Sequence, residues 1–313
     1  MLTLRSFKYL TGLLSLATST QAYTLKNTYD ASNFFDYFNF FTAADPTGGW
    51  VHYIAEDVAK NTGLVRYQNG QVYLGVDYQT YNPAGGRNSV RLTSDIAYTK
   101  GLFIADIAHM PGGICGTWPA YWMFGPNWPS SGEIDIIEGV NKQTTNSITL
   151  HTAAGCTVSN PNSLPGTVTL TSNCNQDNGN TGCGVSTSNT NSYGDGFNAV
   201  GGGVYAMQWA SDGIYVWFWQ RGQIPADITS GNPQTSNWGT PLATFYGSGC
   251  NFDNAFKNNN IVFDTTFCGG WAGSVWSSGS CASYATTCND YVAYNPGAFQ
   301  NAYWLINYVK VYQ

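Results

Sequence analysis

One stretch, residues 132–139, constrains the fold of this 313-residue chain more than any other, and it reads Gly-Glu-Ile-Asp-Ile-Ile-Glu-Gly. Isoleucine has a strong β propensity, so the stretch is predicted to be a strand. Successive side chains of a strand point to opposite faces. Glu133 and Asp135 therefore share one face, and Ile134 and Ile136 share the other.

Strict alternation would place Glu138 on the isoleucine face. A carboxylate that faces an apolar core is costly unless it is paired. One extra residue at Ile136-Ile137, a β-bulge, would turn Glu138 back to the face of Glu133 and Asp135. The spacing therefore predicts a bulged strand that carries three carboxylates on one surface.

The rest of the chain is typical of an all-β protein. It contains 36 glycines, 21 tyrosines, 16 phenylalanines and 11 tryptophans, but only 10% charged residues, whereas soluble helices need more Lys, Glu and Ala. Turn signals such as Asn69-Gly70 and Gly112-Gly113 punctuate short apolar runs. A chain of this length is compatible with one large sandwich domain. The expected strands are 53–54, 65–67, 72–76, 90–92, 102–108, 147–152, 204–209, 213–220, 261–267 and 303–312.

Three segments do not follow this pattern. Residues 31–41 are crowded with aromatic side chains, for which core packing is favoured over an N-terminal flap. Residues 156–196 have little apolar periodicity and are predicted to be a long loop held by cysteines. Residues 269–294 are expected to form a short helix or a decorated loop.

The N-terminus is predicted to be a secretory signal peptide. It has basic Arg5 and Lys8, an apolar centre at 9–17 and the small-residue end Thr20-Gln21-Ala22, so we expect cleavage before Tyr23 and residues 1–22 to be removed. The apolar run is too short for a membrane anchor. The expected mature domain therefore spans residues 23–313 and is extracellular.

Charge and cysteine content narrow the partners. Removing the signal leaves ten basic and 18 acidic residues, a net charge of −8, which disfavours nucleic acid. An even number of cysteines in an exported chain predicts up to four disulfides. The sequence contains no Cys-x-x-Cys pair of the kind that would indicate a zinc site. Cys174 with Cys183, and Cys281 with Cys288, are close enough in sequence to form local bridges. The eight cysteines are at positions 115, 156, 174, 183, 250, 268, 281 and 288.

The carboxylate strand suits glycoside hydrolysis. That reaction uses one protonated carboxyl group to assist the leaving oxygen and one carboxylate to attack the anomeric carbon, about 5–5.5 Å apart in retaining enzymes. Glu133 and Glu138 could supply the pair, and Asp135 could influence how they titrate. A calcium cluster is the alternative, but calcium loops use Asp and Asn with glycine turns.

These residues resemble a known family. The Glu133-x-Asp135-x-x-Glu138 motif, with Gly116-Thr117-Trp118-Pro119-Ala120-Tyr121-Trp122 before it and Thr149-Leu150-His151-Thr152 after it, is similar to the active-site region of glycoside hydrolase family 16. The fungal, laminarinase-like endo-β-1,3(4)-glucanases are the nearest branch. The resemblance implies a concanavalin-like jelly-roll β-sandwich of two curved antiparallel sheets.

The resemblance also implies roles for residues. Glu133 would be the nucleophile, Glu138 the general acid/base and Asp135 the supporting carboxylate. His151 would stand on the neighbouring strand. Indole rings stack on the apolar faces of sugars, and Arg91 could donate to a sugar hydroxyl, with a surface ion pair as its alternative. The candidate sugar platforms are Trp118, Trp122, Trp128 and Trp271, with Trp276 in reserve.

We therefore expect a secreted, monomeric, retaining endo-β-glucanase that cleaves β-1,3 and mixed β-1,3/1,4 glucans. It needs no cofactor and no catalytic metal, although a structural calcium is left open. Neither nucleic acid nor a membrane is an expected partner. The alternatives are a glucan transglycosylase of the same fold and a non-catalytic glucan-binding lectin. A lectin would be expected to have replaced Glu133 or Glu138, and both are present.

Overall fold

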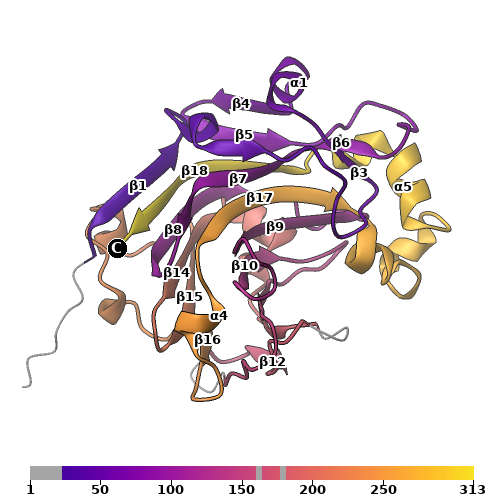
Figure 1. Ribbon diagram of the computed structural model, residues 1–313. Coiled ribbons are helices and arrows are strands. Elements are labelled where there is room, and N and C mark those ends of the chain that lie inside the picture. Colours follow the sequence, from indigo (N-terminus) through magenta and orange to yellow (C-terminus); the bar gives the residue numbers. More distant parts are fainter. Residues whose placement is uncertain (1–22, 160–163, 177–180) are drawn as a thin grey trace, which may run out of the picture.

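The computed structural model describes residues 23–159, 164–176 and 181–313. Their strands form two eight-stranded antiparallel sheets (Figure 1). The expected signal peptide, residues 1–22, lies outside the described residues. Sheet A has the order β16-β15-β14-β8-β18-β5-β4, with β1 beside β18. Its strands are β1 (Leu25–Asp30), β4 (Val65–Gln68), β5 (Gln71–Gly75), β8 (Gly101–His109), β14 (Gly203–Trp209), β15 (Gly213–Gln220), β16 (Ala243–Tyr246) and β18 (Tyr303–Tyr312).

Sheet B carries the carboxylate strand and has the order β12-β13-β11-β10-β9-β17-β7-β2. Its strands are β2 (Phe38–Phe40), β7 (Arg91–Tyr98), β9 (Thr117–Phe124), β10 (Glu133–Glu138), β11 (Ser147–His151), β12 (Val168–Thr171), β13 (Cys183–Ser186) and β17 (Asn259–Phe267). A short parallel pair joins β3 (Val51–Tyr53) to β6 (Arg87–Ser89). This arrangement is the predicted jelly-roll β-sandwich.

The helices are short. The α-helices are α1 (Glu56–Asn61), α2 (Gly194–Ala199), α3 (Ala226–Thr229), α4 (Phe252–Ala255) and α5 (Cys288–Tyr294). The 3₁₀ helices are η1 (Phe34–Asp36), η3 (Thr190–Ser192), η4 (Thr235–Asn237), η6 (Trp276–Ser278), η7 (Ser280–Ser283) and η8 (Pro296–Phe299), and η5 (Gly269–Gly273) is a π-helix. Among the described residues, no helix has the length and apolar character that a membrane crossing requires.

The main core lies between the two sheets. Ile134 and Ile136 of β10 are almost completely buried and belong to one apolar cluster with Phe263 of β17 and with Phe103 and Val311 of sheet A. The isoleucine face of β10 thus points toward sheet A. The face that carries Glu133 and Asp135 is left for the opposite side of sheet B.

Most expected strands are confirmed, with shifted ends. Strands β1, β2, β6 and β16 were not predicted, and two further segments were predicted wrongly. Residues 156–196 are not one loop, because β12 and β13 extend sheet B there and helix α2 follows. Most side chains of β12 are exposed, so this strand has no buried face that would give an apolar periodicity in the sequence. Strand β9 was not predicted, because Pro119 interrupts an otherwise apolar run.

The aromatic segment 31–41 packs into the core, as favoured, and does not form a free flap. Phe34 and Phe38 are buried, and their rings stack with centroids 4.1 Å apart. The segment 269–294 takes the helical alternative, since η5, η6, η7 and α5 occupy it.

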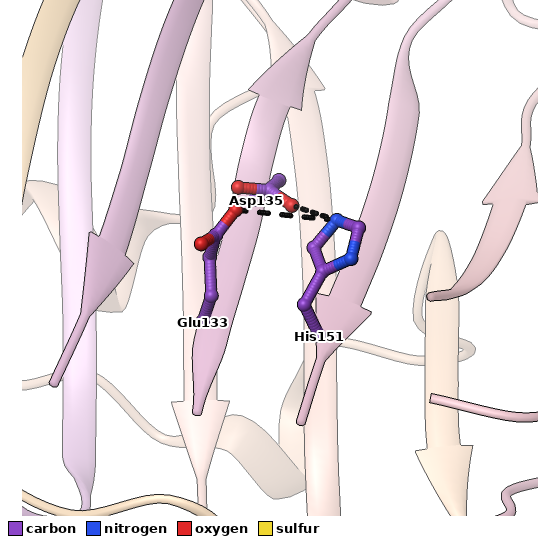
Figure 2. A group of neighbouring side chains, drawn as sticks. All are labelled: Glu133, Asp135 and His151. Atoms are coloured by element: carbon purple, nitrogen blue, oxygen red, sulfur yellow. Dashed lines mark ion pairs between the residues drawn. The ribbon is translucent and has the colours of Figure 1, made fainter. Parts of the chain in front are cut away.

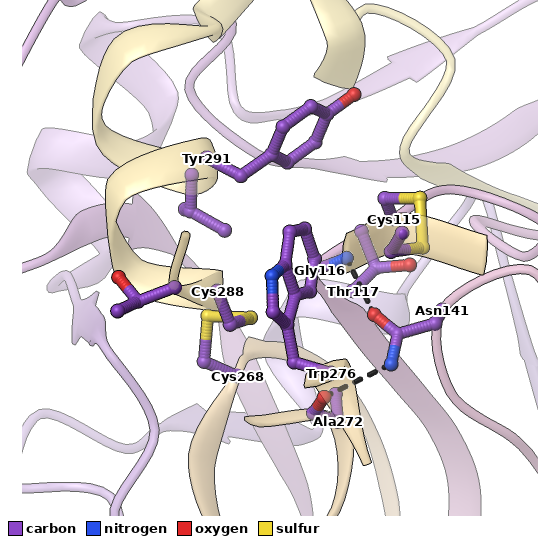
Figure 3. Close-up of a disulfide and its surroundings, with 12 residues drawn as sticks. Cys115, Gly116, Thr117, Asn141, Cys268, Ala272, Trp276, Cys288 and Tyr291 are labelled. Carbon is purple, nitrogen blue, oxygen red and sulfur yellow. Dashed lines mark hydrogen bonds between the residues drawn. A yellow bond between two sulfur atoms is a disulfide. The ribbon is translucent and has the colours of Figure 1, made fainter. Parts of the chain in front are cut away.

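All eight cysteines are bonded, so the expected count of four disulfides is confirmed. The local Cys174–Cys183 bridge is confirmed. The pairing of Cys281 with Cys288 was wrong, because helix α5 packs Cys288 against Cys268 while Cys281 meets Cys115 across 166 residues of chain (Figure 3). The fourth bridge joins Cys156 to Cys250.

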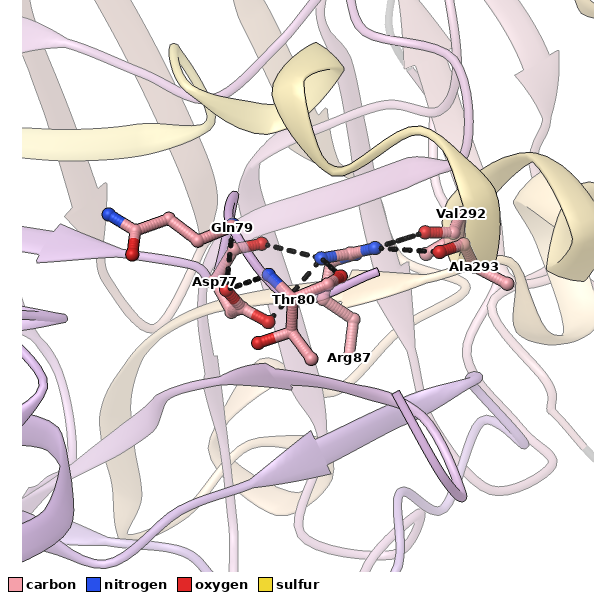
Figure 4. A network of polar contacts seen from close by, with 6 residues as sticks. All are labelled: Asp77, Gln79, Thr80, Arg87, Val292 and Ala293. Carbon is pink, nitrogen blue, oxygen red and sulfur yellow. Dashed lines mark hydrogen bonds and ion pairs between the residues drawn. The ribbon is translucent and has the colours of Figure 1, made fainter. Parts of the chain in front are cut away.

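One buried cation fixes helix α5 to the rest of the fold. Arg87 of β6 is completely buried and donates to the carbonyl oxygens of Val292 and Ala293 at the C-terminal end of α5 (Figure 4). The same guanidinium contacts the carboxylate of Asp77 at 3.4 Å and the carbonyl of Thr80 at 3.1 Å. A cation suits a helix C-terminus, where unpaired carbonyls gather.

Candidate active site

Strand β10 contains the predicted bulge. Asp135 pairs with Thr149 of β11 and Glu138 with Ser147, so three steps on β10 match two on β11. On the other side, the register against β9 shifts between Asp135 and Ile137. The extra residue returns Glu138 to the face of Asp135, and Ile136 and Ile137 stay buried. The predicted bulge at Ile136-Ile137 is therefore confirmed.

Glu133 is the candidate nucleophile at the start of the bulged strand. Its carboxylate accepts a hydrogen bond from the indole N–H of Trp128. Burial and the neighbouring charge of Asp135 raise the pKa of Glu133 from its ordinary value to about 8, and the positive charges of His151 and Arg91 oppose that rise. The two cations favour the ionised form that a nucleophile needs, but burial and Asp135 outweigh them, so the pKa of Glu133 stays raised.

His151 of β11 stands where the resemblance implied, next to the carboxylates (Figure 2). Its Nε2 lies 3.2 Å from Oδ2 of Asp135 and 4.0 Å from Oε1 of Glu133. On the other side of the ring, Nδ1 lies 2.5 Å from Oε1 of Gln176. Burial alone would lower the pKa of His151, but Asp135 and the two glutamates raise it to about 10. The imidazole is therefore an imidazolium at neutral pH.

Glu138 is the candidate general acid/base at the other end of the bulge. Its Oε1 accepts a hydrogen bond of 2.7 Å from the indole N–H of Trp118. Burial, followed by the charge of Asp135, raises the pKa of Glu138 well above its ordinary value. Asp135, only 2% exposed, thus lies between the two glutamates and favours the protonated form of Glu138.

The cleft also contains a carboxylate that the sequence analysis missed, Asp264 of β17. It lies opposite Arg91 of β7 in the strand pairing and accepts hydrogen bonds from the Tyr53 hydroxyl and the Trp122 indole. Burial raises the pKa of Asp264 to about 7, and Arg91 opposes the rise. Asp264 is the only charged residue of the predicted strand 261–267, and that isolation was the available signal.

Arg91 lies in the cleft, as expected for a hydroxyl donor. The alternative of a surface ion pair was wrong, because Arg91 is only 6% exposed and its guanidinium lies 4.8 Å from the ring of Trp122. In the part of the chain that the structure describes, its buried Nε has no hydrogen-bond partner. The role of Arg91 as a donor to a sugar hydroxyl stays a prediction.

The tryptophans separate into two groups. Trp118 and Trp122 line the cleft, Trp271 packs edge-on against Trp118 at 5.7 Å, and Trp128 is half exposed above Glu133. Trp276 is buried in a separate apolar cluster and donates to a backbone carbonyl. The cleft is lined by Thr47, Arg91, Trp118, Ala120, Trp122, Glu133, Asp135, Glu138, Asp264 and Thr266. The roles of these residues toward a sugar stay predictions.

Glu133, Asp135 and His151 also form a group of metal-ligand type, each with one ligand atom within 4.8 Å of the others. A metal ion would need the imidazole in its neutral form, whereas the Asp135 carboxylate next to Nε2 favours the imidazolium. The same three side chains could therefore hold either a proton or a metal ion.

Comparison with known proteins shows the family to which the chain belongs. A model of the XgeA-like catalytic domain of glycoside hydrolase family 16 matches residues 38–312. This chain belongs to glycoside hydrolase family 16. Its bulged carboxylate strand is thus the strand on which the resemblance to that family was based.

Individual members of the family are similar over nearly the whole chain. A probable endo-1,3(4)-beta-glucanase of Aspergillus fumigatus is 50% identical over 95% of this chain. This family 16 chain spans 46% of that relative's length, or about half of it. Two solved structures are also similar: an elongating family 16 β-1,3-glucosyltransferase at 46% identity and Laminarinase 16A of Phanerochaete chrysosporium at 43% identity. Each covers 93% of this chain, is matched over 100% of its own length and has a TM-score of 0.87.

Proposed function

We propose that this family 16 domain cleaves β-1,3 and mixed β-1,3/1,4 glucans inside the chain and retains the anomeric configuration. The bulge of β10 carries the proposal, because it places Glu133, Asp135 and Glu138 on one face of a cleft. Asp135 opposes ionisation of both glutamates and His151 favours it, but Arg91 favours ionisation of Glu133, whereas the charge of Glu133 opposes ionisation of Glu138. Such a pair supplies one nucleophile and one acid.

In the first step, the Glu133 carboxylate attacks the anomeric carbon while Glu138 donates its proton to the glycosidic oxygen. The bond between that carbon and oxygen breaks, and the leaving sugar departs as a neutral alcohol. The products are a glycosyl ester on Glu133 and an ionised Glu138. The raised pKa of Glu138 supports this role, since a general acid must hold its proton at working pH.

In the second step, Glu138 takes a proton from water, and the water oxygen attacks the anomeric carbon from the face that the first sugar left. The ester bond to Glu133 breaks, and Glu133 returns as a carboxylate. Throughout, the His151 imidazolium stabilises the ionised forms of the carboxylates.

The substrate class rests on the cleft lining and on the relatives. Trp118 and Trp122 offer rings for sugar stacking, and Arg91 lines the same cleft. The curated relative is named an endo-1,3(4)-beta-glucanase, and the Phanerochaete laminarinase was solved with β-glucans in donor and acceptor sites. A neutral polysaccharide also suits a chain of net negative charge.

The test is incubation of the purified protein with laminarin and with barley mixed-linkage glucan, with release of reducing ends as the measurement. We expect release from both, and proton NMR early in the reaction should detect the β-anomer first. First-formed α-anomer would exclude the retaining mechanism. Inertness toward both glucans with retained binding would favour the lectin alternative.

A glucan transglycosylase is the second candidate, and one observation favours it. The elongating β-1,3-glucosyltransferase is as similar in fold as the laminarinase. In a transferase, a sugar hydroxyl replaces water in the second step. Mass spectrometry of products from concentrated laminari-oligosaccharides separates the two: longer products than the substrate indicate transfer, and only shorter products indicate hydrolysis.

We also propose that residues 23–313 act as one secreted, monomeric catalytic domain. Four disulfides support export, because such bonds persist in oxidising compartments. The measurements are N-terminal sequencing of protein from culture medium, which should begin at Tyr23, and light scattering after size-exclusion chromatography. A different N-terminus or a dimer mass would contradict the respective part.

A further inference from the structure

Asn146, just before β11, bonds to the backbone on both sides of the bulge. Its Oδ1 accepts a hydrogen bond of 2.9 Å from the N–H of Glu138. Its Nδ2 donates one of 2.8 Å to the carbonyl of Ile136. A bulge disrupts the regular hydrogen-bond ladder between strands. The side-chain amide of Asn146 makes hydrogen bonds to the backbone groups on either side of Ile137. One side chain thus holds the bulge in shape.

The Asn146 side chain cannot easily move, because its own backbone is held in a buried network. Its N–H donates to the Ser192 hydroxyl at 3.3 Å, and its carbonyl accepts from the N–H of Thr187 at 3.2 Å. The hydroxyl of Tyr205 in turn donates to the Ser192 carbonyl at 2.6 Å. These residues are at most 3% exposed. The bulge is therefore supported from the segment before α2.

Glu138 is consequently held at two points. Asn146 fixes its backbone N–H, and the indole of Trp118 donates to its carboxylate. A shift of the backbone would move the carboxyl group away from the glycosidic oxygen, and proton transfer requires hydrogen-bond distance. Glu133 and Asp135 precede the bulge and pair regularly with His151 and Thr149, so their positions depend less on Asn146.

We propose that Asn146 is the positioning residue for the general acid, and that its bulge-spanning amide sets the efficiency of proton donation by Glu138. The inference rests on the proposed function. Asn146 does not line the cleft, and its expected effect is confined to proton donation by Glu138. A merely structural role would instead lower the amount of folded enzyme equally for every substrate.

The test measures the variant Asn146→Ala on two substrates that share the same glycone. One is a laminari-oligosaccharide, whose sugar leaving group needs a proton. The other is a 2,4-dinitrophenyl β-laminaribioside, whose phenolate leaves without one. The measured quantity is kcat/KM, which reports the glycosylation step, and the dinitrophenolate burst counts active sites.

Because general acid catalysis contributes about 10²–10⁴-fold, we expect kcat/KM per active site to fall by about 10²-fold or more for the oligosaccharide. The value for the dinitrophenyl substrate should change by less than about tenfold. Equal losses on both substrates would overturn the proposal. If Asn146→Ala does not fold, the smaller change Asn146→Ser is measured in the same way.

Asn141→Ala is the matched control. Asn141 is also a buried asparagine that joins two backbone groups, since it accepts from the N–H of Gly116 and donates to the carbonyl of Ala272 (Figure 3). It does not touch the bulge, so its variant should affect both substrates by the same factor. A leaving-group preference in Asn141→Ala as large as that in Asn146→Ala would overturn the proposal. Wild-type inertness toward both substrates would instead refute the proposed function.

Discussion

The imidazole of His151 on β11 lies 3.2 Å from the carboxylate of Asp135 on the neighbouring strand β10. This ion pair places one positive charge among three carboxylates. A positive charge favours the ionised form of a neighbouring carboxyl group. The charge of His151 therefore affects the pKa of each carboxyl group around it. Two measurable consequences follow from this one contact.

The first consequence concerns activity. In His151→Gln the loss of positive charge should raise the pKa of Glu133, so less of the nucleophile is ionised at a given pH. The acidic limb of the kcat/KM profile should move to higher pH by about 1–3 units. His109→Gln is the control, because His109 lies on sheet A and stacks on Tyr303. An unmoved limb in His151→Gln would contradict the assignment.

The second consequence concerns stability. The folded state raises the pKa of His151 from 6.5 to about 10, so it keeps a proton that the unfolded chain releases above pH 6.5. The stabilisation is therefore complete below pH 6.5 and is lost as the pH rises through 10. Relative to His151→Gln, the wild-type free energy of unfolding should fall by on the order of 2–4 kcal/mol between pH 6 and 10. Urea titrations measure it, and a constant difference between the proteins would refute it.

Glu133→Gln should abolish turnover and leave binding intact. The amide is nearly the same size but is not a nucleophile, so kcat on laminarin should fall by at least about 10⁴-fold. Calorimetry should still detect oligosaccharide binding. Glu56→Gln provides the control, since Glu56 lies on the surface helix α1 and pairs with Lys60. Near-normal rates in Glu133→Gln would remove Glu133 from the mechanism.

The disulfides should differ in their contribution to stability. Cys115–Cys281 closes 166 residues and Cys174–Cys183 closes nine. In the chain-entropy account, the longer loop restricts the unfolded chain more, by about 2.5 kcal/mol. Replacing the first pair with alanines should therefore lower the free energy of unfolding more than replacing the second. The reverse order in denaturant titrations would show that contacts in the folded state dominate instead.

Arg87→Met should destabilise the fold without changing the chemistry. It removes a buried cation and leaves the carbonyls of Val292 and Ala293 and the Asp77 carboxylate with fewer partners. Breaking a buried pair costs on the order of 3–5 kcal/mol. The activity of folded protein at low temperature should be unchanged. Arg66→Met, at an exposed arginine, should cost less than about 1 kcal/mol, and an equal cost would contradict the role of burial.

Much of the catalytic strand could be predicted, because alternation is a local property of a β-strand. The spacing of Glu133, Asp135 and Glu138 alone required the bulge that β10 shows. The predicted strands 204–209 and 213–220 also formed, as β14 and β15, and they pair as neighbours because only a short turn separates them. Strand β9 escaped prediction because Pro119 is atypical of a central strand.

The sequence by itself determined which side chains share a face of β10, because the two-residue period is built into the backbone. Only the tertiary structure decided what those side chains meet. Asp264 comes beside Arg91 through a strand pairing that spans more than half of the chain, and Cys281 finds Cys115 rather than nearby Cys288. Asn146 reaches the bulge only after β11 aligns with β10. Such contacts depend on register and packing between distant segments, which no local pattern specifies.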